Sequence, residues 1–141
     1  MKTIAALLFL SVLSACHPKV SKEDVSKING YWEIEKVILA DGIEKDYKIN
    51  TMYDYIQITN NTGFRKKVTP QFNGKFLVDN LSEEVEVVFE SDKVYLKYKT
   101  SYAKWKEELK SISDKEMVLV NEEKNEYHYK KTETLNLTNG K

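Results

Sequence analysis

Very few side chains in this sequence could carry chemistry, and those few do not lie at the spacings that chemistry requires. The 141 residues include one cysteine, Cys16, and two histidines, His17 and His128. A histidine that acts as a general base needs a positioned partner, and no Ser-His-Asp or Cys-His arrangement surrounds His128. The sequence shows neither a cluster at metal-ligand spacing nor a glycine-rich phosphate loop. We therefore expect no enzyme activity, no bound metal ion and no other cofactor.

The cysteine ends a short N-terminal pattern whose chemistry is lipid attachment. Lys2 precedes an apolar run over residues 4–13, and two small residues come just before Cys16. The run is about ten residues long, whereas a helix needs about 20 apolar residues to span a bilayer. The motif Leu13-Ser14-Ala15-Cys16 resembles a bacterial lipobox. We therefore predict a lipoprotein signal peptide over residues 1–15 and a lipidated cysteine after it.

Lipidation of Cys16 predicts where the protein works. Diacylglycerol on the thiol and a further acyl chain, such as palmitate, on the amine would anchor the chain stably, because each buried methylene contributes about 0.8 kcal/mol. Lipoproteins of this type commonly reach the outer membrane, and residue 17 is not the aspartate that resembles an inner-membrane retention signal. We predict an envelope protein that is held at the outer membrane through Cys16 and faces the periplasm.

The residues after the anchor are polar and show no clear apolar face. We interpret residues 16–28 as the lipidated cysteine and a tether. A short helix over Lys22–Ile28, capped by the Ser21-x-x-Asp24 pattern, is the alternative. The folded domain is predicted over residues 29–133, and a flexible tail over residues 134–141.

Composition narrows the class of protein further. The chain carries 22 basic and 22 acidic side chains, which gives a net charge of zero. Nucleic acid binding needs a concentrated basic patch, so we expect no nucleic acid partner. The length allows one domain with its own core, and no second cysteine is present to form an intramolecular disulfide. The stability of the domain must therefore come from packing.

Alternating side chains predict β-strands along most of the chain. In Glu84–Glu90 apolar residues alternate with glutamates, and in Lys93–Lys99 they alternate with lysines. Ser91-Asp92 links the two segments, which is the signature of a β-hairpin. An outer row of glutamates then faces an outer row of lysines, and each cross-strand pair contributes about 0.2–1 kcal/mol.

Further strands are expected from the same alternation and from the turn residues between them. They cover Tyr31–Ala40, Met52–Thr59, Phe64–Thr69, Lys75–Val78, Glu116–Val120 and Glu126–Thr132. Strands that recur about every ten residues, joined by short polar turns, predict an all-β antiparallel up-and-down meander rather than βαβ units.

Residues 102–112 fit two interpretations. Apolar residues recur at helical spacing, and a strand would place Glu107 on the same face as Trp105 and Leu109. The surrounding meander favours a strand, because a strand keeps its sequence neighbours paired. We predict a turn over Thr100–Lys104, followed by a strand that runs to Ser113.

The start of the first long strand, Gly30-Tyr31-Trp32, resembles the Gly-x-Trp signature of the lipocalins. The likeness continues through the strand meander to the closing Tyr127-x-Tyr129. It implies a small barrel of about eight strands, in which Gly30 lets the chain enter the first strand and Trp32 plugs the closed end.

Two features of the lipocalin pattern are missing. The sequence has no Thr-Asp-Tyr motif between the late strands, and no late arginine to cover the tryptophan. The single arginine, Arg65, lies in the third predicted strand. Lys130 or Lys131 could cover Trp32 instead through a cation–π contact.

The resemblance implies that a ligand would bind inside the barrel, and we predict a small apolar one. Its expected lining consists of Trp32, Ile34, Asp54, Ile56, Ile58, Val85, Val87, Phe89, Val94, Leu96 and Tyr98. Asp54 is the polar member of this inward set, and it is either a handle for the ligand or a residue of the open rim, which we favour. Small barrels are often filled by their own side chains. The alternative is therefore a filled barrel that serves as a protein- or glycan-interaction module of the envelope.

Overall fold

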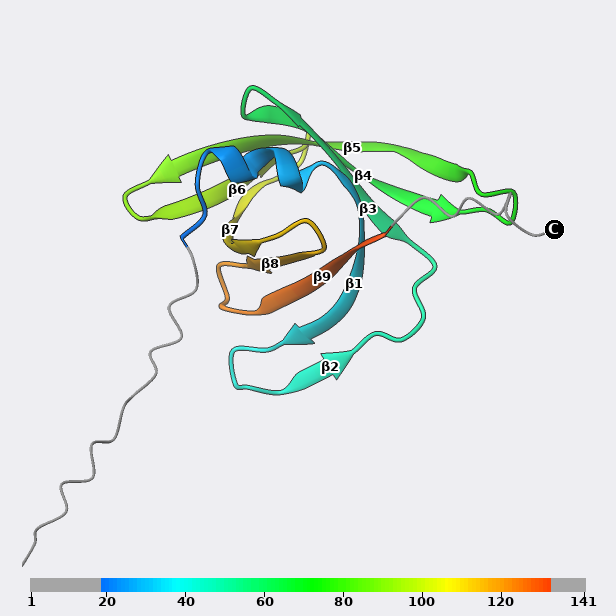
Figure 1. The fold of residues 1–141 in the computed structure, drawn as a ribbon, viewed down its shortest axis with the longest axis horizontal. Helices are drawn as coiled ribbons and strands as arrows, with labels where there is room; N and C mark the ends of the chain where they lie inside the picture. Colours follow the sequence, from blue (N-terminus) through cyan, green and yellow to red (C-terminus); the bar gives the residue numbers. More distant parts are fainter. Residues whose placement is uncertain (1–18, 133–141) are drawn as a thin grey trace, which may run out of the picture.

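The computed structural model describes residues 19–132, which form an antiparallel β-barrel (Figure 1). Its elements are the 3-10 helix η1 (Glu23–Ile28) and the strands β1 (Gly30–Ile38), β2 (Glu44–Asp46), β3 (Tyr53–Thr59), β4 (Thr62–Pro70), β5 (Phe76–Glu90), β6 (Lys93–Lys99), β7 (Lys104–Ile112), β8 (Glu116–Val120) and β9 (Glu126–Thr132). Neighbouring strands pair in the order β2-β1-β3-β4-β5-β6-β7-β8-β9. Because β1 also pairs with β9, eight strands close into a barrel and β2 remains outside it. The predicted all-β meander is confirmed.

The β5–β6 hairpin follows the register expected from its alternating residues. Glu84 lies opposite Lys99 and Glu86 opposite Lys97, so the glutamate and lysine rows face each other. Salt bridges join Lys99 to Glu84 at 3.6 Å and Lys97 to Glu90 at 2.9 Å. The predicted charge pairing between these two strands is confirmed.

The ambiguous segment is a strand. Residues 100–103 form a turn, and β7 follows it over Lys104–Ile112, as predicted. Leu109 and Glu107 both point into the barrel and are buried. The inward glutamate finds a cationic partner in the interior, so it does not oppose strand formation here.

The predicted end of one strand is wrong. The strand expected over Lys75–Val78 does not stop at Asp79-Asn80, because β5 runs through these residues without a break. The Asp79 side chain accepts a hydrogen bond from the Leu81 backbone N–H at 3.1 Å. Residues 79–81 then lie opposite the single residue Lys67 of β4, because the register shifts at this point. The aspartate therefore builds a β-bulge, which bends the strand and leaves it continuous.

The β4–β5 pair extends beyond the barrel as a two-stranded arm (Figure 1). One side of the arm packs on the outside of the barrel, where the Phe76 ring stacks on Tyr31 at 4.2 Å. Phe72, Leu77 and Leu81 on the arm are exposed. The sequence predicted strands over Phe64–Thr69 and Lys75–Val78, which form the arm, but not the extension of this pair beyond the barrel. The short strand β2 was not expected.

The segment before β1, which we interpreted as a tether, packs against the barrel. Val25 and Ile28 of η1 are buried in the core. The Asp24 carboxylate accepts hydrogen bonds at 2.9 Å from both the backbone N–H and the hydroxyl of Ser21. The short helix that we weighed as the alternative is therefore present as a 3-10 helix. The predicted signal peptide, Cys16 and the C-terminal tail lie outside the described residues.

The core is centred on Trp32. Its side chain is 0% exposed, and its indole N–H donates to the Ile28 carbonyl at 2.7 Å. The Lys131 ammonium lies 4.9 Å from the indole ring centre, as one of our two alternatives predicted. Gly30 has φ +130°, and a Cβ atom there would lie 3.4 Å from Cε of Lys131. The Gly-x-Trp motif thus combines a backbone that favours glycine with a plug that Lys131 covers.

Candidate functional site

The predicted lining residues lie inside the barrel, and most are packed into one hydrophobic cluster. Trp32, Ile56, Ile58, Val85, Val87, Val94, Leu96 and Tyr98 are buried members of the cluster, and Ile34 and Phe89 pack against it while partly exposed. Met117, Leu109 and Leu119 from the opposite wall complete it. Side chains that are 0–5% exposed and touch one another fill the space that an apolar ligand would need.

Beside this cluster, the single arginine crosses the barrel interior. Arg65 of β4 donates to Glu107 of β7 at 3.2 Å and to Glu83 of β5 at 2.5 Å. Its guanidinium carbon also lies 4.1 Å from the centre of the Tyr98 ring. Burial opposes the charge, but the carboxylates of Glu83, Asp54 and Glu107 hold the pKa of Arg65 above its usual value. Arg65, Glu83 and Glu107 were not among the predicted lining residues, so the sequence did not indicate this ion-pair network.

Asp54 belongs to the same polar group. It points inward as predicted, but it is only 4% exposed, so the structure buries it instead of leaving it at an open rim. The Lys67 ammonium forms an ion pair with Asp54 Oδ1 at 2.6 Å. That contact lacks hydrogen-bond geometry, and Oδ1 has no hydrogen-bond partner among the described residues.

Two tyrosines surround the bridge. The Tyr98 hydroxyl is buried and makes no hydrogen bond within residues 19–132. Burial is the main reason that the pKa of Tyr98 is raised well above its usual value. Burial likewise raises the pKa of Tyr129, and the charges of Asp54 and Glu107 add to the effect. Both phenols are therefore neutral at physiological pH, and each retains a proton that it can donate.

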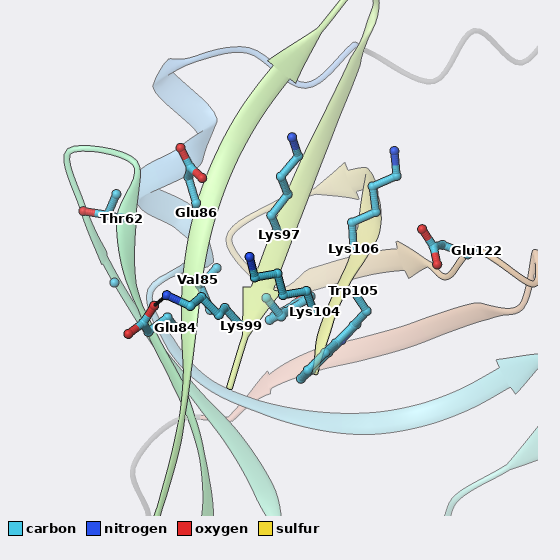
Figure 2. Close-up of a pocket in the computed structure, with 12 residues that line it drawn as sticks. Thr62, Glu84, Val85, Glu86, Lys97, Lys99, Lys104, Trp105, Lys106 and Glu122 are labelled. Atoms are coloured by element: carbon cyan, nitrogen blue, oxygen red, sulfur yellow. Dashed lines mark ion pairs between the residues drawn. The ribbon is translucent and has the colours of Figure 1, made fainter. Parts of the chain in front are cut away.

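A sizeable hollow lies on the outside of the barrel. This groove has a volume of about 710 Å³ and runs across β5, β6 and β7. Lys97, Lys106 and Glu122 line it, whereas Arg65 and Glu107 of the interior bridge do not. Figure 2 shows the amino groups of Lys97 and Lys106 projecting to one side of the strands, while the Trp105 ring lies on the other side. The groove is therefore walled by outward-facing charged side chains.

Three inward residues form the floor of the groove. Val85, Tyr98 and Trp105 lie side by side in the register of β5, β6 and β7. The Trp105 ring stacks on Tyr98 at 5.3 Å on the inner side of the sheet. Since Val85 and Tyr98 are almost completely buried, the floor is mainly backbone. Among the eleven predicted lining residues, these two also line the groove.

The groove walls are two rows of charges that follow the strand register. Glu84, Lys99 and Lys104 form one row, and Glu86, Lys97 and Lys106 form the other. Glu122 follows the second row, and a smaller hollow of about 200 Å³ shares Lys106 and Glu122 with the groove. Through the β5–β6 hairpin, the sequence indicated the glutamates of β5 and the lysines of β6 in this pattern. It indicated the lysines of β7 only weakly, because that segment also fitted a helix.

His128 takes no part in either site. It lies on β9 opposite Val118 and Lys36, and its Nε2 atom is 3.2 Å from a carboxylate oxygen of Glu126. In the described part of the chain, no group of three or more histidine, cysteine, aspartate or glutamate side chains is placed to hold a metal ion. Within that same part, no helix is long and apolar enough to cross a membrane.

The family of the chain follows from its sequence match. Residues 28–119 match the profile of the lipocalin-like domain family, so the chain belongs to this family. The matched region begins at the end of η1 and includes Gly30, Trp32 and most of the barrel. The closed eight-stranded barrel agrees with the architecture that the resemblance implied.

Two solved structures are similar in outline. One is a lipocalin-like protein from Bacteroides uniformis, with 10% identity and a TM-score of 0.49, covering 75% of this chain and 99% of that chain. The other is an uncharacterized protein from Bacteroides eggerthii, with 12% identity and a TM-score of 0.47, covering 74% of this chain and 98% of that chain. No curated protein matches the sequence.

Proposed function

We propose that this chain is a lipid-anchored binding protein of the bacterial envelope, which holds its partner on the outside of a filled barrel. The observation that carries the proposal is the position of the hollow. The predicted lining residues are packed together inside, whereas the groove of about 710 Å³ lies over the outer face of β5, β6 and β7. A barrel whose interior is occupied by its own side chains offers its exterior for recognition.

The nature of the groove also favours a macromolecular or polar partner over a small apolar one. Its walls carry Lys97, Lys99, Lys104 and Lys106 together with Glu84, Glu86 and Glu122. Alkyl stems of lysine and glutamate provide apolar contact, and their charged ends provide orientation. Charged rims of this kind contribute to partner choice and to the rate of encounter more than to affinity.

Site-directed photocross-linking in cells that produce the protein would test this proposal. A photoreactive residue at Glu86 would lie in the groove, and one at Glu116 on β8 provides an exposed control outside it. We expect a discrete cross-linked product from position 86 and none of that size from position 116. Equal products from both positions, or no product from position 86, would contradict binding of an envelope partner at the groove.

A second candidate, a small ligand inside the barrel, is favoured by one observation. The buried hydroxyl of Tyr98 has no hydrogen-bond partner among the described residues, and its ring lies 4.1 Å from the guanidinium carbon of Arg65. A buried polar atom without a partner costs about 1–3 kcal/mol, which a polar ligand atom or water would recover. Mass spectrometry of small molecules that co-purify with the protein tests this candidate. A stoichiometric ligand that is lost in Tyr98→Phe supports it, and a protein without such a ligand counts against it.

A further inference from the structure

The β6–β7 hairpin places like charges directly opposite each other. Lys97 lies opposite Lys106, and Lys99 lies opposite Lys104, in the register of the two strands. These four residues, which we call the lysine quartet, all line the outer groove. Like charges in directly opposed cross-strand positions destabilise a sheet, so folding alone does not account for two such pairs side by side.

The carboxylates around the quartet neutralise only its β6 half. Lys97 pairs with Glu90 at 2.9 Å, and Lys99 pairs with Glu84 at 3.6 Å. Lys104 and Lys106 of β7 have no carboxylate within 4.0 Å in the part of the chain that the structure describes. The Lys106 ammonium lies 4.6 Å from the centre of the Tyr95 ring, which is a cation–π contact and does not neutralise the positive charge. Positive charge is therefore left over at the β7 side of the groove.

Two further glutamates limit this excess without removing it. Glu86 lies opposite Lys97 in register, and Glu122 lines the end of the groove beyond Lys106. Neither carboxylate forms a salt bridge with Lys104 or Lys106. The excess is greatest beside Lys99 and Lys104, where Glu84 is the single carboxylate of the row.

We propose that the lysine quartet binds the oxyanion groups of an anionic ligand. This inference rests on the proposed function, because it names the chemistry of the partner at the same groove. Ammonium groups donate charge-assisted hydrogen bonds to phosphate and carboxylate oxygens, and a bound oxyanion relieves the repulsion within each opposed pair. The two lysine pairs are two residues apart along the strands, which is about 7 Å. A ligand with two or more anionic groups at about that spacing reaches both pairs.

The test uses the full-length lipoprotein in a nonionic detergent, titrated with tripolyphosphate by calorimetry. In the variant Lys104→Gln/Lys106→Gln, the two quartet lysines of β7 are neutral and the salt bridges of Lys97 and Lys99 remain. The matched control is Lys45→Gln/Lys75→Gln, which removes the same charge from exposed positions on β2 and next to β5. Binding to the quartet predicts at least a tenfold loss of affinity in the β7 variant and unchanged affinity in the control.

Thermal unfolding shows whether a loss of affinity reflects binding or misfolding. Because the quartet opposes like charges, the β7 variant should unfold at the same temperature as the unchanged protein or at a higher one. Equal affinity in all three proteins, or no binding of tripolyphosphate by any of them, would overturn the proposal. Affinity lost equally in both variants would also overturn it, since that result reports net charge alone.

A competition arm identifies the source of the oxyanion. If mixed micelles with phosphatidylglycerol displace tripolyphosphate from the unchanged protein, a lipid headgroup supplies the anion; without displacement, a soluble ligand supplies it. Either result supports the quartet as the site. Failure of tripolyphosphate binding with persistent cross-links from position 86 would reject the anionic ligand but leave the groove as an interface. Anion binding without cross-links would keep the site and reject the envelope partner.

Discussion

Arg65 on β4 reaches Glu107 on β7 across the interior of the barrel, with 3.2 Å between Nη1 and Oε1. The two residues are 42 positions apart in the sequence, and three strand pairings separate them around the sheet. Glu107 is 7% exposed, so its buried carboxylate needs the guanidinium of Arg65 as a partner of opposite charge. This contact explains how an inward glutamate can lie in the middle of a barrel strand.

Removal of Arg65 should therefore strongly destabilise the fold. Arg65→Met leaves Glu107 buried without its partner, and the expected loss in the free energy of unfolding is about 3–5 kcal/mol, measured by urea denaturation. Adding Glu107→Gln to that variant should recover part of the loss, because the uncompensated charge is gone. A double variant as unstable as Arg65→Met alone would show that the bridge is not the cause.

Lys131 should contribute to stability through Trp32. Its ammonium lies over the indole ring and donates to the Lys27 carbonyl at 2.8 Å, so it ties β9 to the end of η1. Lys131→Met should lower the free energy of unfolding by about 1–2 kcal/mol and shift the tryptophan fluorescence. Lys130→Met is the matched control, since Lys130 is half exposed and pairs with Glu33 at 3.6 Å. Equal losses in the two variants would contradict a specific role for Lys131.

Asp24 predicts an acid-sensitive contribution to stability. The ammonium of Lys27 and the Ser21 donors lower the pKa of Asp24 from 3.8 to about 2. Because the folded-state pKa is the lower one, the contribution is complete above pH 3.8 and is lost as the pH falls towards 2. Urea unfolding of Asp24→Asn should give a stability difference from the unchanged protein that is constant near neutral pH and shrinks below pH 3.8. A difference that persists undiminished at the acid end would refute this explanation.

Cys16 should decide where the protein is found. If the lipid on Cys16 is the anchor, Cys16→Ser should move the protein from the membrane fraction to the soluble fraction while the barrel stays folded. Cell fractionation and circular dichroism measure the two effects. The conservative control is Ala15→Gly, which leaves Ser14 and Cys16 unchanged. A Cys16→Ser protein that remains in the membrane fraction would show that another segment holds it there.

The sequence predicts those parts of the fold that depend on neighbouring residues. Alternation of side chains is local, so the β5–β6 hairpin and its charge rows could be predicted with the correct register. The Asp79 bulge could not, because the same Asx hydrogen bond can reverse a chain or kink a strand, and the pairing with β4 decides between them. The strand β2 also escapes prediction, since Glu44–Asp46 is short and all three of its residues are exposed.

The candidate site was harder to predict than the fold. The sequence showed only that Arg65 is not the late arginine of the lipocalin pattern. Its contact with Glu107 could not be predicted, because Glu107 lies in a segment that also fitted a helix. The burial of Asp54 depends on the charges of Lys67 and Arg65 beside it, and the sequence alone does not place them there. The opposition of Lys97 to Lys106 becomes visible only when the β6–β7 register is known. Contacts across the interior can be predicted only when the closed barrel is known. Opposed side chains on neighbouring strands can be predicted only when the register is known.

The barrel interior is filled by its own side chains, and we propose that binding takes place on its outside. The most direct measurement is an NMR titration of the isotope-labelled protein with tripolyphosphate, which maps the backbone amides that respond. We predict that the chemical-shift changes concentrate at residues 84–86, 97–99 and 104–106, while the amide chemical shifts of Trp32 and Arg65 do not change. Shifts centred on Trp32 and Arg65, with the groove unaffected, would contradict binding on the outside of the barrel.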